Sequence, residues 1–502
     1  MTGAATASRS TLIFLICVPL AVLMGYMLAE PTASTSMLLL LTVVGIISIP
    51  LFLRWQHGML LFSCNAVVFP YFLPGRPPLW LPVCFACMFL LIVDRAMSKP
   101  VNLFHDKKLS WSLIFLGIVT VFTAYANGTS FGSLSSSNSG GKRYFYILAA
   151  IFSFFCLATN PIKPGKVPRF AALYFLSGLT SLVGYIALVG GPSLYFLGLL
   201  FPIEGTVLEY MNARSDLSGN SFERNGGLGS AALALMCFLG ATYGIRGMLE
   251  IRKPWRLFLL ILAVAASLFS GYRSVFLLIV LIFGALFVYE GLLKTRYFLI
   301  FSAIGVISLF FLFSFSSMLP QSIQRTICFL PLEVDLNVRA QADDSSNWRL
   351  EMWKELMPMV PKYLLKGKGY GINSSEVHMA QQVANSGFNA RYEVSILTGD
   401  YHSGPLSVII PLGLAGAVAF IWFLLSALRI LHLNYVYGNP SLKTFNTFII
   451  SLFVAHILCF IFVFGSLYSD LIVFTSLAGF SLGINGGVAQ PPGKTPKLFL
   501  KK

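Results

Sequence analysis

The sequence predicts an all-α, polytopic integral membrane protein with about 12–14 transmembrane helices and a long, partly helical loop outside the membrane. Three observations lead to this fold class: 56% of the 502 residues are hydrophobic, only 11% are charged, and the charges cluster between long apolar runs. A soluble protein of this composition would expose large apolar patches and aggregate. Most of the chain is therefore expected to be solvated by lipid.

The predicted crossings are the apolar runs that reach, or nearly reach, the roughly 20 residues that a bilayer requires. They lie near 11–29, 37–53, 58–73, 79–93, 110–126, 144–159, 170–189, 228–245, 255–270, 274–290, 297–315, 405–430, 444–465 and 470–486. The pair at 58–73 and 79–93 is the weakest of them. The first run follows only Arg9 and precedes no clear small-residue cleavage site, so we interpret it as a retained helix and not as a signal peptide.

The distribution of Lys and Arg predicts the orientation of these helices. With the N-terminus in the cytoplasm, 21 of the 35 basic residues fall in inside segments, and eight of the others lie in the long segment 316–404, where the positive-inside rule has little force. Short loops therefore favour this orientation by 21 to 6. The net charge of +16 reflects topology, and no nucleic-acid partner is expected.

This topology predicts that residue 384 lies outside the membrane. A reporter enzyme that is active only outside, fused after Ala384, should be active, because an odd number of predicted crossings separates it from the cytoplasmic N-terminus. A silent reporter at this position would contradict the orientation.

The chain divides into three predicted regions. Residues 1–315 hold transmembrane helices with an outer loop at about 190–227, residues 316–404 form the long outer loop, and residues 405–502 hold the C-terminal transmembrane helices and a basic cytoplasmic tail. Within the long loop, a helix is predicted to start at a cap on Ser346 or Asn347 and to stop at Pro358. The glycines of KGKGYG at 366–371 predict a tight turn near a ligand or another helix, and the remainder up to Asp400 is predicted to form a lid.

Neither of two possible metal signals is strong. Cys84 and Cys87 form a CxxC within an apolar span with no second pair and no His nearby, which favours simple packing of small apolar side chains. Asp343 and Asp344 are adjacent in a polar run and do not have metal-ligand spacing. We therefore expect no metal and no cofactor.

Four arginines on the outer side are candidate anion ligands. Arg273 stands at the end of an apolar span, with Ser274 able to cap the next helix, so its charge must be paired, reach the interface or serve a ligand. A guanidinium matches phosphate oxygens bidentately, and a helix N-terminus adds free N–H groups. For Arg214, Arg224 and Arg349 the competing interpretation is an ordinary surface ion pair with neighbouring acids, which contributes little stability.

His402 is the one histidine that precedes the outer end of a predicted membrane helix. Ser403 can cap that helix and Pro405 can occupy its first turn. With an unperturbed pKa near 6.5, its imidazole could accept a proton from a hydroxyl group. A structural role for an interfacial histidine is the alternative.

The order of these features is similar to that in the O-antigen ligase and O-antigen polymerase family of bacterial envelope enzymes. The resemblance covers roughly 270–420 and consists of four motifs: SGYR at 270–273, NWRLEMW at 347–353, KGKGYG at 366–371 and YHSGPLSVIIPLGLAG at 401–416. Two details depart from the family pattern, because Ser403 stands where many members have Asn and Gly404-Pro405 follows the histidine directly. These departures bear on the subfamily and leave the histidine and arginines in place.

The resemblance implies a membrane glycosyltransferase. Members move a saccharide from a polyprenyl (undecaprenyl) diphosphate carrier to an acceptor hydroxyl, commonly without a metal. By this resemblance His402 would be the catalytic base of an inverting transfer, and Arg273, Arg349, Arg224 and Arg214 would bind the diphosphate. The expected partners are the lipid-linked glycan donor, a glycan or lipid A-core acceptor and membrane lipid, at the bacterial inner membrane with the active site facing the periplasm.

Several alternatives remain open at this stage. Within the family, the motifs do not separate a ligase from a polymerase of repeat units or from a protein O-glycosyltransferase, and ligase is only slightly favoured. A lipid-linked glycan flippase or transporter would usually carry ionisable residues near mid-membrane, which are few here. The sequence contains no GxxxxGK[ST] motif, so nothing in it indicates ATP binding. A non-catalytic assembly partner would keep the topology without the chemistry.

Overall fold

The computed structural model describes most of the chain from residue 55 onward. The described residues are 55–71, 73, 75–96, 104–128, 140–159, 161–202, 225–371, 395–396 and 399–491, with a few isolated positions between 18 and 47. The predicted spans at 11–29 and 37–53 and nearly all of the predicted lid at 375–400 lie outside them.

Every regular element in the described residues is a helix, so the predicted all-α class is confirmed. The α-helices are α3 (Trp80–Ala96), α4 (Lys107–Ala126), α6 (Lys142–Thr159), α7 (Val167–Leu176), α8 (Ser181–Val189), α10 (Gly226–Met248), α11 (Pro254–Phe269), α12 (Arg273–Tyr289), α13 (Arg296–Phe315), α14 (Gln321–Ile327), α15 (Leu336–Leu356), α16 (Met359–Tyr363), α19 (Gly404–Tyr437), α20 (Lys443–Phe462) and α21 (Leu467–Asn485). Short 3-10 turns lie at Pro164–Lys166, Ser177–Thr180, Pro192–Leu199, Leu292–Lys294, Ser316–Met318 and Pro440–Leu442.

Eight helical segments of the described chain are long and apolar enough to cross a membrane, and α11 and α12 are shorter apolar helices. The eight are 107–126, 142–159, 164–187, 226–248, 296–318, 404–437, 440–462 and 467–485. Only a helix satisfies all of its own backbone hydrogen bonds in lipid, so these apolar segments identify a polytopic membrane protein.

The predicted span at 58–73 is wrong in its second half. A helix covers 55–65, but the chain then leaves the helical conformation and passes through Pro70. The Phe69 N–H donates to the Leu200 carbonyl at 2.7 Å, and the Leu79 N–H donates to the Val68 carbonyl at 2.8 Å. Apolar composition alone predicted a crossing there, whereas neighbouring segments satisfy this backbone instead.

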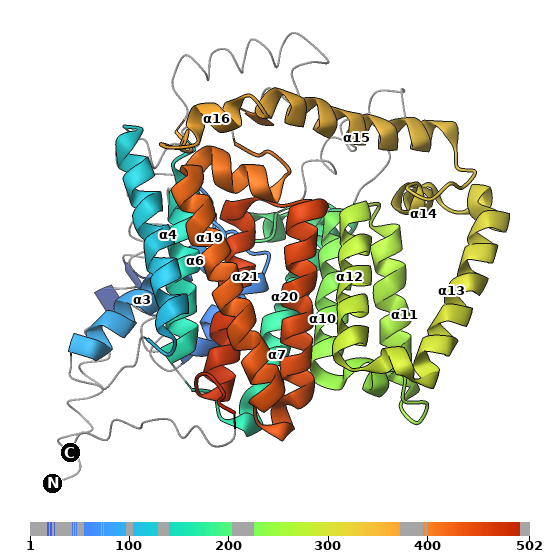
Figure 1. The fold of residues 1–502 in the computed structure, drawn as a ribbon, viewed down its shortest axis with the longest axis horizontal. Helices are drawn as coiled ribbons and strands as arrows, with labels where there is room; N and C mark the ends of the chain where they lie inside the picture. The colour runs from blue at the N-terminus through green and yellow to red at the C-terminus, as the bar shows by residue number, and fades with distance from the viewer. Residues whose placement is uncertain are drawn as a thin grey trace.

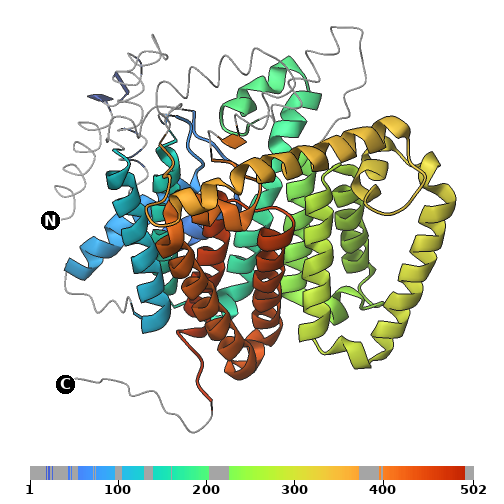
Figure 2. The same cartoon turned by 45° about the horizontal axis from the view of Figure 1, so that its top comes forward.

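The helices pack as a bundle in which three of the four main helix pairs are far apart in sequence (Figures 1 and 2). The main pairs are α6 with α21, α10 with α11, α4 with α19 and α12 with α20. Small residues permit this approach: a Cβ on Gly479 of α21 would stand 2.9 Å from the Phe154 carbonyl oxygen of α6. Figure 1 shows α13 at the edge of the bundle, and none of its residues is buried.

Cys84 and Cys87 lie in the core of this bundle. Their side chains are 0% and 4% exposed, and the Cys87 thiol lies 3.7 Å from the Gln56 carbonyl oxygen. Both therefore act as small apolar packing residues of α3, as their position within an apolar run predicted.

Helix α15 lies across one end of the bundle, above α12 and α19 (Figure 2). It begins at Leu336, where the Asp335 carboxylate accepts the Asn337 N–H at 2.8 Å, so the predicted cap at Ser346 or Asn347 is wrong. The polar residues before Ser346 continue the helix because Val338 and Ala342 bury one of its faces. The predicted end at Pro358 is confirmed, since α15 stops at Leu356.

The glycine turn after α16 packs against a break in α19. Gly413 has φ of 66°, which interrupts the helix two residues after Pro411. The backbone groups released by the break pair with the turn through three bonds: Lys368 N to Ile410 O at 2.8 Å, Gly369 N to Pro411 O at 2.9 Å, and Leu414 N to Leu364 O at 2.6 Å. The turn therefore lies against another helix, one of the two settings that its glycines predicted.

Replacing Gly367 by alanine should destabilise this junction. Gly367 has φ of 74°, and an added Cβ would contact the Pro411 carbonyl oxygen. The positive φ costs about 1–2 kcal/mol, and the forced backbone shift adds about 1–3 kcal/mol. Gly291→Ala is a matched control, because Gly291 has φ of 69° with open space around its Cβ position. Thermal unfolding in detergent micelles should show the larger loss for Gly367→Ala, and equal losses would contradict this account.

Candidate functional site

His402 lies on a strained turn just before α19. It is one of two described non-glycine residues with positive φ, at 48°, a conformation that is seldom adopted without a compensating constraint. Tyr401, which is 1% exposed, anchors the turn, and its carbonyl accepts the indole N–H of Trp353 at 2.9 Å. Ser403 occupies the N-cap position of α19 and Pro405 its first turn, as predicted, although the Ser403 side chain makes no cap bond.

Two aromatic rings hold the imidazole in place. The His402 ring lies 5.3 Å from that of Trp348 on α15 and 5.1 Å from that of Phe464, in the loop between α20 and α21. These contacts fix the ring between segments that are far apart in the sequence. No sequence pattern indicated Phe464, which is one apolar residue among many.

The charges near His402 favour the neutral imidazole. Burial lowers the pKa of His402, the Asp400 carboxylate opposes this by raising it, and the Arg349 guanidinium lowers it further. The His402 Nδ1 lies 4.0 Å from the Asp400 Oδ1. A neutral imidazole at neutral pH retains the lone pair that a general base requires.

Arg349 belongs to the same cluster. Its guanidinium carbon lies 6.0 Å from the centre of the Phe464 ring that also contacts His402. Ser346 and Arg349 lie on one face of α15, three positions apart, and Trp348 beside them contacts the His402 ring. The structure therefore brings two of the predicted site residues together through α15.

Arg273 approaches the same helix from α12. One guanidinium nitrogen donates to the Ala342 carbonyl at 3.1 Å and the other to the Ser346 hydroxyl at 3.4 Å. Ser346, which Arg273 contacts, and Arg349 are one helical turn apart on α15. The guanidinium groups of Arg273 and Arg349 therefore lie beside the same turn of this helix. Helix α12 begins at Arg273 itself with no side-chain cap, so the predicted capping role of Ser274 is wrong.

Arg214 and Arg224 lie outside the described residues. Asp343 and Asp344 are adjacent exposed residues of α15. Among the residues that the structure describes, no group of three or more His, Cys, Asp or Glu side chains could hold a metal ion.

Several buried polar atoms around this end of the bundle have no hydrogen-bond partner among the described residues. They include Nδ1 of His402, Nε1 of Trp348 and Nη1 of Arg143. Buried donors and acceptors are nearly always paired in folded proteins, because an unpaired one costs about 1–3 kcal/mol. Their clustering near one turn is typical of a site that is completed by a ligand.

Sequence reasoning missed Asp400, Trp348, Phe464 and Arg143. Asp400 stands two residues before His402, so its proximity could have been noticed. Arg143 is one of the six short-loop cations that the predicted topology leaves outside, which was an available signal. Trp348 and Phe464 contact the histidine only through the tertiary fold.

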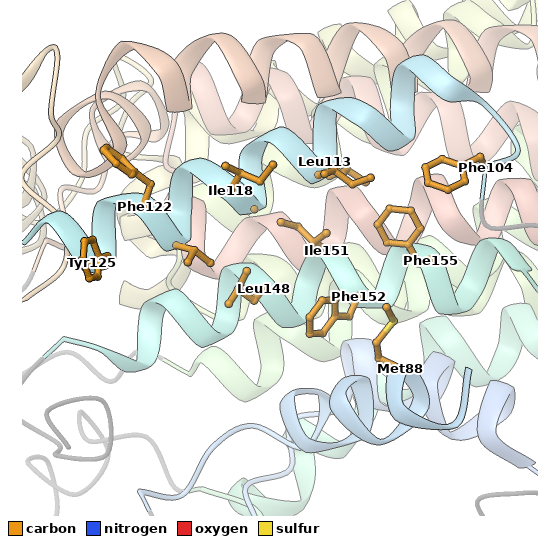
Figure 3. A pocket seen from close by; sticks show the side chains of 13 residues that line it. Met88, Phe104, Leu113, Ile118, Phe122, Tyr125, Leu148, Ile151, Phe152 and Phe155 are labelled. Carbon is orange, nitrogen blue, oxygen red and sulfur yellow. The ribbon is translucent and has the colours of Figure 1, made fainter. Parts of the chain in front are cut away.

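A separate apolar groove lies between α3, α4 and α6 (Figure 3). Its volume is about 720 Å³, and it extends along α4 from Leu113 to Tyr125 and along α6 from Leu148 to Phe155. Its lining contains no charged side chain. It can hold an apolar chain, and its lining offers no acid, base or anion ligand.

Comparison with known proteins identifies one family. Residues 257–421 match the model of a family described as O-antigen ligase. The matched segment contains Arg273, Arg349 and His402 and extends from α11 into α19. No curated protein matches the chain.

Proposed function

We propose that this chain, whose residues 257–421 match the O-antigen ligase family, transfers a glycan from a polyprenyl diphosphate carrier to an acceptor hydroxyl. The acceptor is lipid A-core, and the reaction takes place at the periplasmic face of the bacterial inner membrane. The observation that supports this most directly is the convergence of Arg273, Arg349 and His402 on α15 and the turn before α19.

The guanidinium groups bind the leaving group in this proposal. When the glycosidic bond to phosphate breaks, negative charge grows on the diphosphate oxygens. Arg273 and Arg349 neutralise this charge with planar, bidentate donors. Arg214 and Arg224 are proposed as further diphosphate ligands from the loop before α10. Trp348 Nε1, which is buried without a hydrogen-bond partner among the described residues, is available as an additional donor.

His402 activates the acceptor. The Asp400 carboxylate, 4.0 Å from Nδ1, favours the tautomer with its proton on Nδ1 by charge attraction, which leaves the lone pair on Nε2. Nε2 takes the hydroxyl proton while the acceptor oxygen forms a bond to the anomeric carbon. The bond from that carbon to the phosphate oxygen breaks on the opposite face. The configuration inverts, and the polyprenyl diphosphate leaves with the electron pair.

The chemistry is the same for a ligase and a polymerase, so the acceptor distinguishes them. The purified full-length protein is reconstituted in proteoliposomes with polyprenyl diphosphate-linked glycan and lipid A-core. Glycan attached to lipid A-core supports the proposal, whereas longer lipid-linked chains identify a polymerase. Donor that crosses the bilayer without a new glycosidic bond identifies a flippase, and no change in either substrate contradicts an enzymatic role.

The pH dependence of transfer should report the surroundings of His402. In a plot of kcat/KM against pH, activity should be lost at acid pH as His402 becomes protonated. Because burial lowers the pKa of His402, the midpoint of this loss should lie below the ordinary histidine value near 6.5. Asp400→Asn removes the group that raises this pKa, so the midpoint should move to lower pH. Arg349→Gln removes a group that lowers the pKa of His402, so the acid loss of the remaining activity should have its midpoint at higher pH.

The measurement is the initial transfer rate between pH 4.5 and 8, at donor concentrations well below KM. Asp400→Asn and Arg349→Gln serve as mutual controls, because their shifts have opposite signs. A midpoint that moves in the same direction in both variants would show that another group titrates.

A further inference from the structure

Arg143, in the first turn of α6, lies outside the described cluster of Arg273 and Arg349. Its guanidinium carbon lies 4.4 Å from the centre of the Tyr468 ring and 5.9 Å from that of Tyr370. Its Nη1 is buried and has no hydrogen-bond partner in the described part of the chain. The tyrosine rings favour the cation through their electron-rich faces, and the Tyr468 hydroxyl accepts a hydrogen bond from the guanidinium. The Nη1 donor is not satisfied by either ring.

The described residues provide no anion for this charge. None of their carboxylates forms an ion pair with Arg143. The adjacent Lys142 is exposed to solvent at its amine, which donates to the Gly75 carbonyl at 3.2 Å. Burial of an arginine donor without a partner is costly, so such an arrangement usually reflects a ligand.

The backbone beside Arg143 leaves space for that ligand. Gly399 has φ of 73°, and a Cβ added there would stand 2.8 Å from the Arg143 Nη1. The same turn continues through Asp400, whose carboxylate lies 4.0 Å from the His402 ring nitrogen. Any side chain at residue 399 would therefore fill the approach to Nη1, three residues before the proposed base.

We propose that Arg143, together with Tyr370 and Tyr468, binds a negatively charged group on the acceptor saccharide, a phosphate or a carboxylate. This inference rests on the proposed glycosyl transfer. The guanidinium binds the anion through Nη1. The half-buried Tyr468 ring offers an apolar face to the sugar beside it. The acceptor hydroxyl then reaches His402 from the side that carries Asp400.

The acceptor is a better fit than the donor for a structural reason. The proposed diphosphate ligands Arg273 and Arg349 both meet at α15. Arg143 belongs to α6, and its contacts are with Tyr370 and with Tyr468 of α21. A second anion at Arg143 therefore occupies a separate part of the site, as a two-substrate reaction requires.

Steady-state kinetics of the full-length protein in proteoliposomes test the assignment. Arg143→Gln should raise KM for lipid A-core at least tenfold, with less than a twofold change in the donor KM. Arg143→Lys, which retains the charge but loses the planar donors, should be intermediate. Lys142→Gln, which removes a neighbouring charge, should match the wild type. A rise in the donor KM with no change for the acceptor would overturn the proposal.

A binding measurement separates this proposal from the transfer reaction. Glucose 6-phosphate and glucuronate are titrated against glucose while the fluorescence of the protein is recorded, because Trp80 packs on Tyr146 in the same turn of α6. Both anionic sugars should bind the wild type at least tenfold more tightly than they bind Arg143→Gln, and glucose should not distinguish the two proteins. Equal binding to both proteins would overturn the site. Intact binding without any transfer by the wild type would count against the proposed function instead. Unfolding temperatures of all variants show whether the substitutions preserve the fold.

Discussion

His402→Ala should reduce glycan transfer by about 10²–10⁴-fold, because a general base contributes a factor of this size and no other imidazole of the described residues contacts the same rings. Binding of the donor should be nearly unchanged, since the guanidinium groups of Arg273 and Arg349 remain. The measurement is kcat with saturating donor and lipid A-core in proteoliposomes. The fall should therefore appear in kcat and not in the donor KM.

A histidine elsewhere on α19 provides the control. His432 lies near the far end of the same helix, where its ring is 6.1 Å from that of Tyr435. His432→Ala removes an equivalent side chain from the same element and should retain wild-type transfer. If His402→Ala transferred glycan at the normal rate, the role of a base at this position would be excluded.

Arg273→Lys should lower kcat/KM by about tenfold to hundredfold, because charge-assisted hydrogen bonds contribute about 1.5–3 kcal/mol each and an ammonium lacks the planar pair of donors. The side chain also holds α15 through Ala342 and Ser346, and a lysine cannot donate to both in the same geometry. Transfer assays at several donor concentrations measure the loss.

Two further variants separate binding of the diphosphate from the positioning of α15. Ser346→Ala removes the 3.4 Å contact with Arg273 and the 3.0 Å bond from the hydroxyl to the Ala342 carbonyl of its own helix, and should have a much smaller effect than Arg273→Lys. Arg296 opens α13 much as Arg273 opens α12, so Arg296→Lys is a matched control and should be neutral. Full activity in Arg273→Lys would mean that its planar donors are dispensable for the reaction.

The sequence predicted the membrane-spanning architecture well because each span must be both apolar and helical. It failed at 58–73, where Phe69 and Val68 find backbone partners in neighbouring segments, and composition carries no record of such partners. The start of α15 was missed for a related reason. Its polar first half is helical because Val338 and Ala342 bury one face and because Arg273 binds the Ala342 carbonyl.

The candidate site was predicted in part. Motif order indicated Arg273, Arg349 and His402, and the structure places all three around α15 and the turn before α19. Phe464 and Arg143 were missed because their relevance comes from contacts across more than 60 and 250 residues of chain, respectively. A single sequence reveals which side chains are chemically capable, but not which distant rings and cations surround them.

The break at Gly413 determines how high above the lipid the proposed chemistry takes place. The part of α19 beyond the break, Leu414–Tyr437, is about 36 Å long at 1.5 Å per residue, so it can cross the roughly 30 Å hydrocarbon core unaided. The ten residues before the break, Gly404–Gly413, then lie outside the hydrocarbon core. His402 would stand among the phosphates of the outer leaflet, at the level where a carrier lipid presents its own pyrophosphate, and the carrier would not need to be lifted out of the bilayer to react.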